Sequence, residues 1–106
     1  MRTLADGYKV ARLRGEDISP LQAFYLATLG GVRALDLEDS IGNFLTGKEA
    51  DFLILDREAT PIIKHRLDVS KNLNEQLFAM MMLGDDRLIK ETWIMGEKSH
   101  DRDITY

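Results

Sequence analysis

The sequence predicts an α+β fold whose sheet is incomplete, and three observations support this. Apolar residues recur at helical spacing in residues 1–14 and 19–31. Phe52–Leu55 is an unbroken apolar run, which is typical of a strand covered on both faces. The other clear strand is Leu88–Met95, with Ile41–Phe44 as a candidate third. Because an isolated pair of strands is only marginally stable in water, we expect the sheet to need neighbours from elsewhere.

The first helix is predicted over residues 1–14, and Gly15 is expected to end it. One apolar stripe runs along it, formed by Met1, Leu4, Ala5, Tyr8 and Ala11. No residue caps the helix at Met1, which suggests that the chain was cut from a longer one.

A second helix is predicted to begin at Ser19. Ser19 can cap it, Pro20 suits its first position, and Gln22 can complete a capping box. The pair Gly30-Gly31 is expected to stop this helix, because glycine is common just after a helix end. A short helical turn is then expected over Val32–Leu37.

Beyond Ile41 the pattern becomes extended, with Gly42 and Gly47 on either side of a turn. The segment Arg57–Leu67 is expected to be irregular. Within it Thr60-Pro61 should be extended, because proline disfavours a helical conformation of the residue before it.

A third helix is predicted to begin after Asn72 or Asn74 and to end at Gly84. Its apolar face is expected to carry Leu73, Leu77 and Met81. Asp85-Asp86 is expected to form a turn before the last strand, and Gly96–Tyr106 is expected to be a polar tail.

Composition limits the classes of protein to consider. The chain has 106 residues, 44% of them hydrophobic and 30% charged, which is typical of one globular domain. It has no cysteine, so disulfides and thiolate metal sites are excluded, and we expect a cytoplasmic protein. Residues 1–14 carry a charge of +3 and the remainder −7, which argues against nucleic-acid binding. No apolar run approaches the ~20 residues that span a membrane.

The two histidines, His65 and His100, do not form a metal-binding motif. They lie 35 residues apart, in neither an HxH nor an HExxH spacing. Zinc needs three or four ligands, so we interpret both as surface histidines.

Carboxylates cluster in three places. Paired carboxylates can perform acid–base chemistry when burial separates their pKa values. These clusters adjoin glycines and turns, so we interpret them as solvated caps and expect no catalytic residue among them. They are Glu16-Asp17, Asp36-Glu38-Asp39 and Asp85-Asp86.

Asp51 directly precedes the apolar run Phe52–Leu55. It could be a catalytic carboxylate. We favour the interpretation that it forms a turn, accepts hydrogen bonds from nearby backbone N–H groups and fixes the entry into the strand.

Three stretches resemble the C-terminal end of the amidohydrolase superfamily. They are SPLQAFYLATLGGVRALDL (Ser19–Leu37), IGNFLTGKEADFLILD (Ile41–Asp56) and TWIMGE (Thr92–Glu97). Within that superfamily, RTLADGYKVARLRG (Arg2–Gly15) and LFAMMMLGDDR (Leu77–Arg87) are most similar to the guanine deaminase family. One departure is Asp36, where the family often has glycine.

The resemblance implies a (β/α)8 barrel beside a small β-sandwich built from both chain ends. Residues 1–37 would then be the last barrel helices, and residues 38–106 would be strands and a helix of the composite sandwich. The implied enzyme uses a zinc-activated water to convert guanine to xanthine and ammonia. Its implied ligands are an HxH pair, two later histidines and an aspartate, and none of them matches a residue here.

This comparison gives no catalytic, cofactor-binding or metal-binding residue in the chain. We therefore expect the chain alone to be inactive and to bind no zinc. Its implied partners are the missing N-terminal and barrel segments, and a homo-oligomer is expected. Trp93, the only tryptophan, should be largely buried in the assembled sandwich.

Three alternatives remain at this point. The chain could be an interaction or oligomerisation domain that pairs its sheet edge with a partner. It could also be the C-terminal segment of another aminohydrolase or of a chlorohydrolase-like enzyme. A helix-turn-helix DNA binder is disfavoured, because residues 19–39 contain only Arg33 against Asp36, Glu38 and Asp39.

Overall fold

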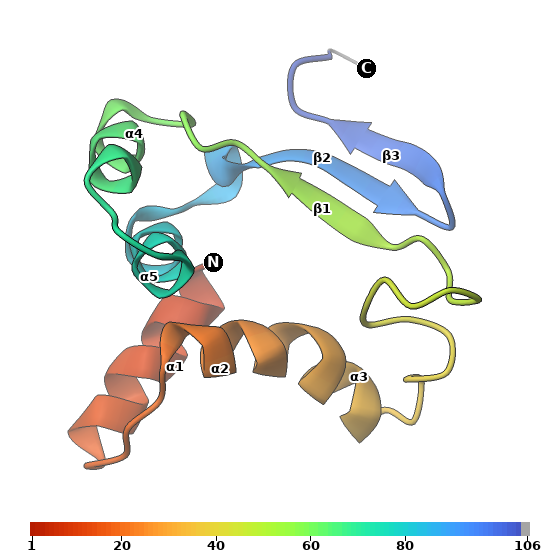
Figure 1. The fold of residues 1–106 in the computed structure, drawn as a ribbon, viewed down its shortest axis with the longest axis horizontal. Coiled ribbons are helices and arrows are strands. Elements are labelled where there is room, and N and C mark those ends of the chain that lie inside the picture. The colour runs from red at the N-terminus through yellow and green to blue at the C-terminus, as the bar shows by residue number, and fades with distance from the viewer. Residues whose placement is uncertain (105–106) are drawn as a thin grey trace.

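The order of helices and strands gives an α+β fold, with helices at one end and an antiparallel sheet at the other (Figure 1). The computed structural model describes residues 1–104. Its elements are α1 (Arg2–Leu13), α2 (Pro20–Tyr25), η1 (Leu26–Gly30), α3 (Gly31–Ala34), β1 (Phe52–Leu55), α4 (Pro61–Asp68), α5 (Leu73–Leu83), η2 (Asp86–Leu88), β2 (Ile89–Ile94) and β3 (Glu97–Asp101).

The first helix is confirmed. Helix α1 buries Ala5 and has no side-chain cap at Met1. After the helix Gly15 has φ +78°, a left-handed conformation that glycine adopts without strain. This turn directs the chain towards Ser19.

The capping box at Ser19 is confirmed. The Ser19 hydroxyl accepts from the Gln22 N–H at 3.1 Å, and the Ser19 N–H donates to the Gln22 side chain at 2.8 Å. Pro20 occupies the first turn, where its missing N–H costs nothing. Both predicted reasons for a helix start therefore operate here.

The prediction that Gly30-Gly31 stops this helix is wrong. Both glycines are helical, and α2, η1 and α3 form one kinked helix. A Cβ on Gly30 would lie 2.8 Å from Cε1 of Tyr25, and a Cβ on Gly31 would lie 2.9 Å from the carbonyl oxygen of Leu26. The two glycines thus serve close packing beside the kink, and not termination.

The kink itself is centred on Thr28. Its backbone lies at φ −120° and ψ −107°, outside the helical region. The Thr28 hydroxyl donates to the carbonyl of Phe24 at 2.8 Å, which partly replaces the lost ladder bond. The helix ends beyond Ala34, where Asp36 has φ +58°.

The sheet contains β1, β2 and β3 in that order, with both pairs antiparallel. Strand β1 is confirmed at its predicted bounds and β2 nearly so. The candidate strand Ile41–Phe44 is wrong, because residues 41–43 form bends and Phe44 has no regular structure. The turn between Gly42 and Gly47 is present, with both glycines at positive φ.

The predicted polar tail from Gly96 is wrong over Glu97–Asp101, which form β3. Met95 and Gly96 both have positive φ, +53° and +77°, as a two-residue type I′ hairpin turn requires. Strand β3 lies at one edge of the sheet, and all of its residues except Asp101 are exposed, which suits its polar composition. Thr105 and Tyr106 lie outside the described residues.

The segment predicted to be irregular contains α4. Thr60 is extended as expected, but its hydroxyl accepts from the Ile63 N–H at 3.3 Å and caps a helix that starts at Pro61. The pre-proline restriction therefore set an N-cap here, and not a continuing extended segment. Asn72 caps α5 as predicted, accepting from the Glu75 N–H at 2.9 Å.

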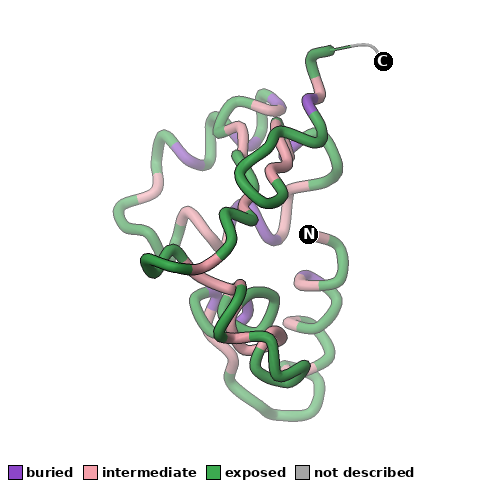
Figure 2. The backbone as a smooth tube through the Cα atoms, turned by 90° about the vertical axis from the view of Figure 1, so that its right-hand side faces the viewer, coloured by how far each residue is buried: buried purple, intermediate pink, exposed green. Residues whose placement is uncertain are grey.

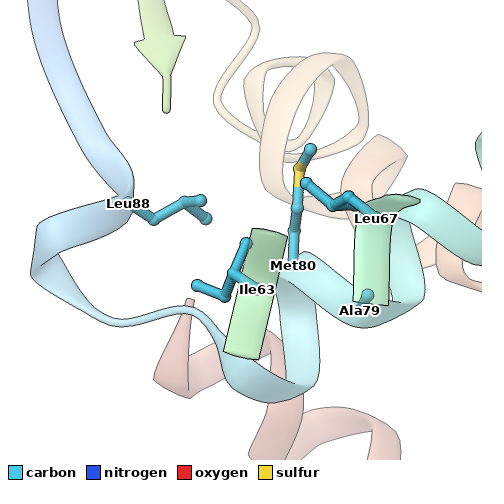
Figure 3. Close-up of a cluster of buried hydrophobic side chains, with 5 residues drawn as sticks. All are labelled: Ile63, Leu67, Ala79, Met80 and Leu88. Atoms are coloured by element: carbon cyan, nitrogen blue, oxygen red, sulfur yellow. The ribbon is translucent and has the colours of Figure 1, made fainter. Parts of the chain in front are cut away.

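Two small apolar clusters hold these elements together. The first joins α4, α5 and the residue before β2, and its side chains face one another in Figure 3. It consists of Ile63, Leu67, Ala79, Met80 and Leu88. The second joins α1, α2 and α5 through Ala5, Ala23 and Met81. The predicted α5 face is correct at Met81 but wrong at Leu73, which is 60% exposed.

Burial outside these clusters is slight, and most of the backbone in Figure 2 is exposed or half-buried. Within this chain β1 is not covered on both faces, so the expectation that neighbours from elsewhere cover it stays a prediction. Leu53 and Ile54 are 50% and 39% exposed. No helix among residues 1–104 combines the length and apolarity needed to cross a membrane.

Arg102 ties the three strands together at one end of the sheet, where β1 and β3 end and β2 begins. Its guanidinium donates to Asp56 Oδ2 at 2.8 Å and to the carbonyl of Arg87 at 2.6 Å. The Glu58 N–H and then Arg102 hold the pKa of Asp56 below its ordinary value of 3.8. On β3, Lys98 lowers the pKa of Asp101, with a smaller contribution from the Asp103 N–H. Both carboxylates therefore stabilise the fold in their charged form.

We predict that Gly84→Ala destabilises the fold. A Cβ on Gly84 would collide with the carbonyl oxygen of Met80, a backbone atom that cannot move away alone. The expected loss is about 1–3 kcal/mol in the free energy of unfolding, measured by urea denaturation. Gly7→Ala is the matched control: it meets no atom within 4 Å and should stabilise α1 by up to about 1 kcal/mol. Equal effects of the two changes would contradict the packing.

We also predict that acid destabilises the sheet. Since the folded-state pKa values of Asp56 and Asp101 are lowered, their stabilisation is complete above the unfolded-state pKa and is lost as pH falls through the folded-state values. The urea concentration at the unfolding midpoint should thus decrease as the pH is lowered below about 5. An Asp56→Asn/Asp101→Asn variant should show a shallower fall, and an unchanged pH profile would count against these roles.

Candidate functional site

The histidines lie on separate elements and are both exposed, His65 on α4 and His100 on β3. Across residues 1–104, no group of three or more His, Asp or Glu side chains could hold a metal ion. The described residues therefore do not fit the zinc centre that the family resemblance implies.

The carboxylate clusters are engaged at the surface. Arg12 donates to Asp17, and Arg14 lies 3.5 Å from Glu16. Asp85 caps η2 and accepts from the Arg87 guanidinium, which holds the pKa of Asp85 below its ordinary value. This geometry agrees with the interpretation of these residues as caps and surface pairs.

The third cluster differs in one respect. Glu38 is half-buried, and its Oε2 atom is fully buried with no hydrogen-bond partner in the described chain. Sequence reasoning gave no sign of this, because the burial comes from the folding of the surrounding loop.

Asp51 accepts a backbone hydrogen bond, but from a distant part of the chain. Its Oδ1 atom takes the N–H of Met95 at 2.8 Å, across 44 residues, and the Gly96 N–H donates to the carbonyl of Ala50 at 3.0 Å. The expectation of a nearby backbone donor is thus wrong, while the structural role is supported. Asp51 anchors the β2–β3 turn, where Met95 has an unfavourable positive φ.

Three aromatic rings form a ladder at the sheet. Phe52 stacks on Trp93 with ring centroids 5.5 Å apart, and Phe44 lies 6.0 Å from Phe52. The Trp93 indole N–H donates to Glu91 at 2.8 Å. Phe44 is 84% exposed, so the ladder ends in solvent.

Among residues 1–104, more large hydrophobic side chains are exposed than buried. We call one group of them, drawn from the kinked helix, the following loop and the sheet, the apolar surface. It comprises Leu21, Tyr25, Leu26, Leu35, Leu37, Phe44, Leu45, Leu53, Ile54, Ile94 and Met95. Because Leu53 and Ile54 are neighbours in β1, they point to opposite faces of the sheet, so the apolar surface is not confined to one face. We take it as the candidate region of contact with other segments.

We predict that Asp51→Ala weakens the fold by about 1 kcal/mol, because the Met95 N–H loses its acceptor. Asp51→Asn should be milder, since its amide oxygen can still accept that bond. Thermal unfolding followed by circular dichroism measures both changes. If both variants unfolded at the same midpoint temperature as the wild type, Asp51 would have no role in holding the hairpin.

Comparison with known proteins supports the amidohydrolase resemblance described in the sequence analysis. The amidohydrolase family model matches residues 1–98. The chain is 50% identical over 102 residues to a guanine deaminase of Escherichia coli, covering 96% of this chain and 23% of that protein. A human guanine deaminase is 34% identical over 92 residues, which is 84% of this chain and 20% of that protein.

Solved structures agree. The structure described as E. coli guanine deaminase superimposes with a TM-score of 0.93, at 50% identity, covering 96% of this chain and 24% of that one. A guanine deaminase from Bradyrhizobium japonicum gives a TM-score of 0.84 at 32% identity, covering 96% and 28%. The chain spans about a quarter of these relatives, and the predicted resemblance is confirmed. Because the amidohydrolase family model matches nearly the whole chain, the protein belongs to the amidohydrolase family.

Proposed function

We propose that this chain is a C-terminal scaffold segment of a guanine deaminase, an enzyme that hydrolyses guanine to xanthine and ammonia. Support comes from the 50% identity and the TM-score of 0.93 to the E. coli enzyme. In this proposal residues 1–37 complete the barrel and residues 38–106 contribute to the composite β-sandwich. The assembled enzyme is a cytoplasmic homo-oligomer.

The observation that carries the proposal is the apolar surface. Phe44, Leu53 and Ile94 are 84%, 50% and 51% exposed. Covering them with another segment would yield roughly 25 cal/mol for each Å² of apolar area removed from water. In the same assembly Trp93, which is half-buried here, becomes largely buried.

Catalysis belongs to the rest of the enzyme. The described residues do not provide a metal site, so zinc would be held by segments outside this chain. This chain contributes packing, and we expect it to be inactive alone.

A chimera tests the scaffold role. In the E. coli enzyme, the segment that aligns with this chain is replaced by residues 1–106, and xanthine release from guanine is measured. The turnover rate of the chimera should lie within about tenfold of that of the unmodified enzyme. This corresponds to a difference of at most roughly 1.4 kcal/mol in the activation free energy. The E. coli enzyme lacking the segment should be inactive. A folded, zinc-loaded chimera without turnover would reject the proposal.

The purified 106-residue chain is assayed in parallel, with zinc content and intact mass measured on the same sample. We expect neither turnover nor stoichiometric zinc. Turnover with bound zinc in a sample of the correct mass would show that the chain is a catalyst itself, contrary to the proposal.

A further inference from the structure

A cavity of about 390 Å³ lies where four helices meet. Its wall is built by α1, the start of α2, the end of α4 with the linker after it, and the first half of α5. This volume is at the lower end of the range for small-molecule sites, about 300–1,000 Å³, and suits a ligand with a single ring.

One wall of the cavity is apolar and aromatic. Tyr8 of α1 and Phe78 of α5 meet edge to face, with ring centroids 5.5 Å apart and planes at 71°. Pro20 and Val69 also line the cavity. A flat apolar body placed here would contact ring and methyl groups and remove them from water.

Two cations line the same cavity, and neither is neutralised within residues 1–104. The side chains of Arg66 and Lys71 have no hydrogen bond or ion pair there. Two residues before Arg66 on α4, Lys64 is paired with Asp68 at 2.8 Å. The chain has 18 Asp and Glu residues against 14 Lys and Arg residues, so Arg66 and Lys71 do not lack partners because carboxylates are scarce.

Among the described residues, Glu75 is the carboxylate that lines the cavity, and it is already engaged. Glu75 accepts the backbone N–H of Lys71 at 2.6 Å through Oε2. The cavity therefore combines an aromatic wall with a net positive charge, although the whole chain carries −4.

We propose that this cavity binds a small aromatic carboxylate, with the ring against Tyr8 and Phe78 and the carboxylate on Arg66 and Lys71. A guanidinium offers two parallel N–H donors that match a carboxylate, and the ammonium adds a second charge. The proposal is argued from the residues that line this cavity and does not rest on the function proposed for the assembled enzyme.

Fluorine NMR with para-fluorobenzoate tests the site. We expect saturable binding in the millimolar range. Arg66→Gln should weaken it by about tenfold, the loss of one charge-assisted hydrogen bond. Arg2→Gln is the matched control, because Arg2 is exposed and does not line the cavity. It should leave binding unchanged. The neutral probe para-fluorobenzamide should bind about tenfold more weakly than the carboxylate.

The titrations use the 106-residue chain and the chimera, and the chimera decides the result if the chain alone is unfolded. The difference between Arg66→Gln and Arg2→Gln isolates this cavity from any other site in the larger protein. Absent binding, equal binding by both variants, or equal binding of the amide would each overturn the proposal. Because the readout is not turnover, it is independent of the chimera's activity.

Discussion

The packing of α5 is the constraint on which the rest of the structure depends. Adjacent residues Met80 and Met81 belong to different clusters, one with α4 and Leu88 and the other with α1 and α2. Because neighbouring helical residues point about 100° apart, one helix can hold two layers. Unbranched methionine side chains suit such a position, since they adapt to irregular gaps. The sheet is connected to this centre mainly through Leu55 and Leu88.

The arrangement leaves the sheet and the kinked helix with little covering of their own. A protein is stable by a small margin between large opposing terms, and here the apolar contribution is divided between two small clusters. The ion pairs at Asp56 and Asp101 and the Asp51 hydrogen bond act at the sheet, where apolar packing is thin. Polar contacts thus fix the geometry of an element whose apolar partners would come from outside the chain.

The sequence allowed prediction wherever a local rule determined the structure. The Ser19 capping box, the Asn72 cap and the apolar run of β1 each depend on residues close together in the chain. The failures have another origin. Gly30-Gly31 serves close packing against Tyr25 and Leu26. Helix α4 begins at a Thr-Pro pair, which can also be extended. Strand β3 is polar and exposed, so no apolar pattern marks it in the sequence. The surface role of the carboxylate clusters was predictable from the sequence. The cavity between the helices was not, because four separate segments form it.

The kink at Thr28 has a consequence for how the two halves of this helix are held at their angle. The backbone of Thr28 leaves the helical region, so the ladder of backbone hydrogen bonds is interrupted there and does not by itself fix the direction of the second half. Across this break, Arg33 of α3 donates to the Tyr25 hydroxyl of α2 at 2.9 Å. This side-chain contact acts as a brace that holds one side of α3 towards Tyr25.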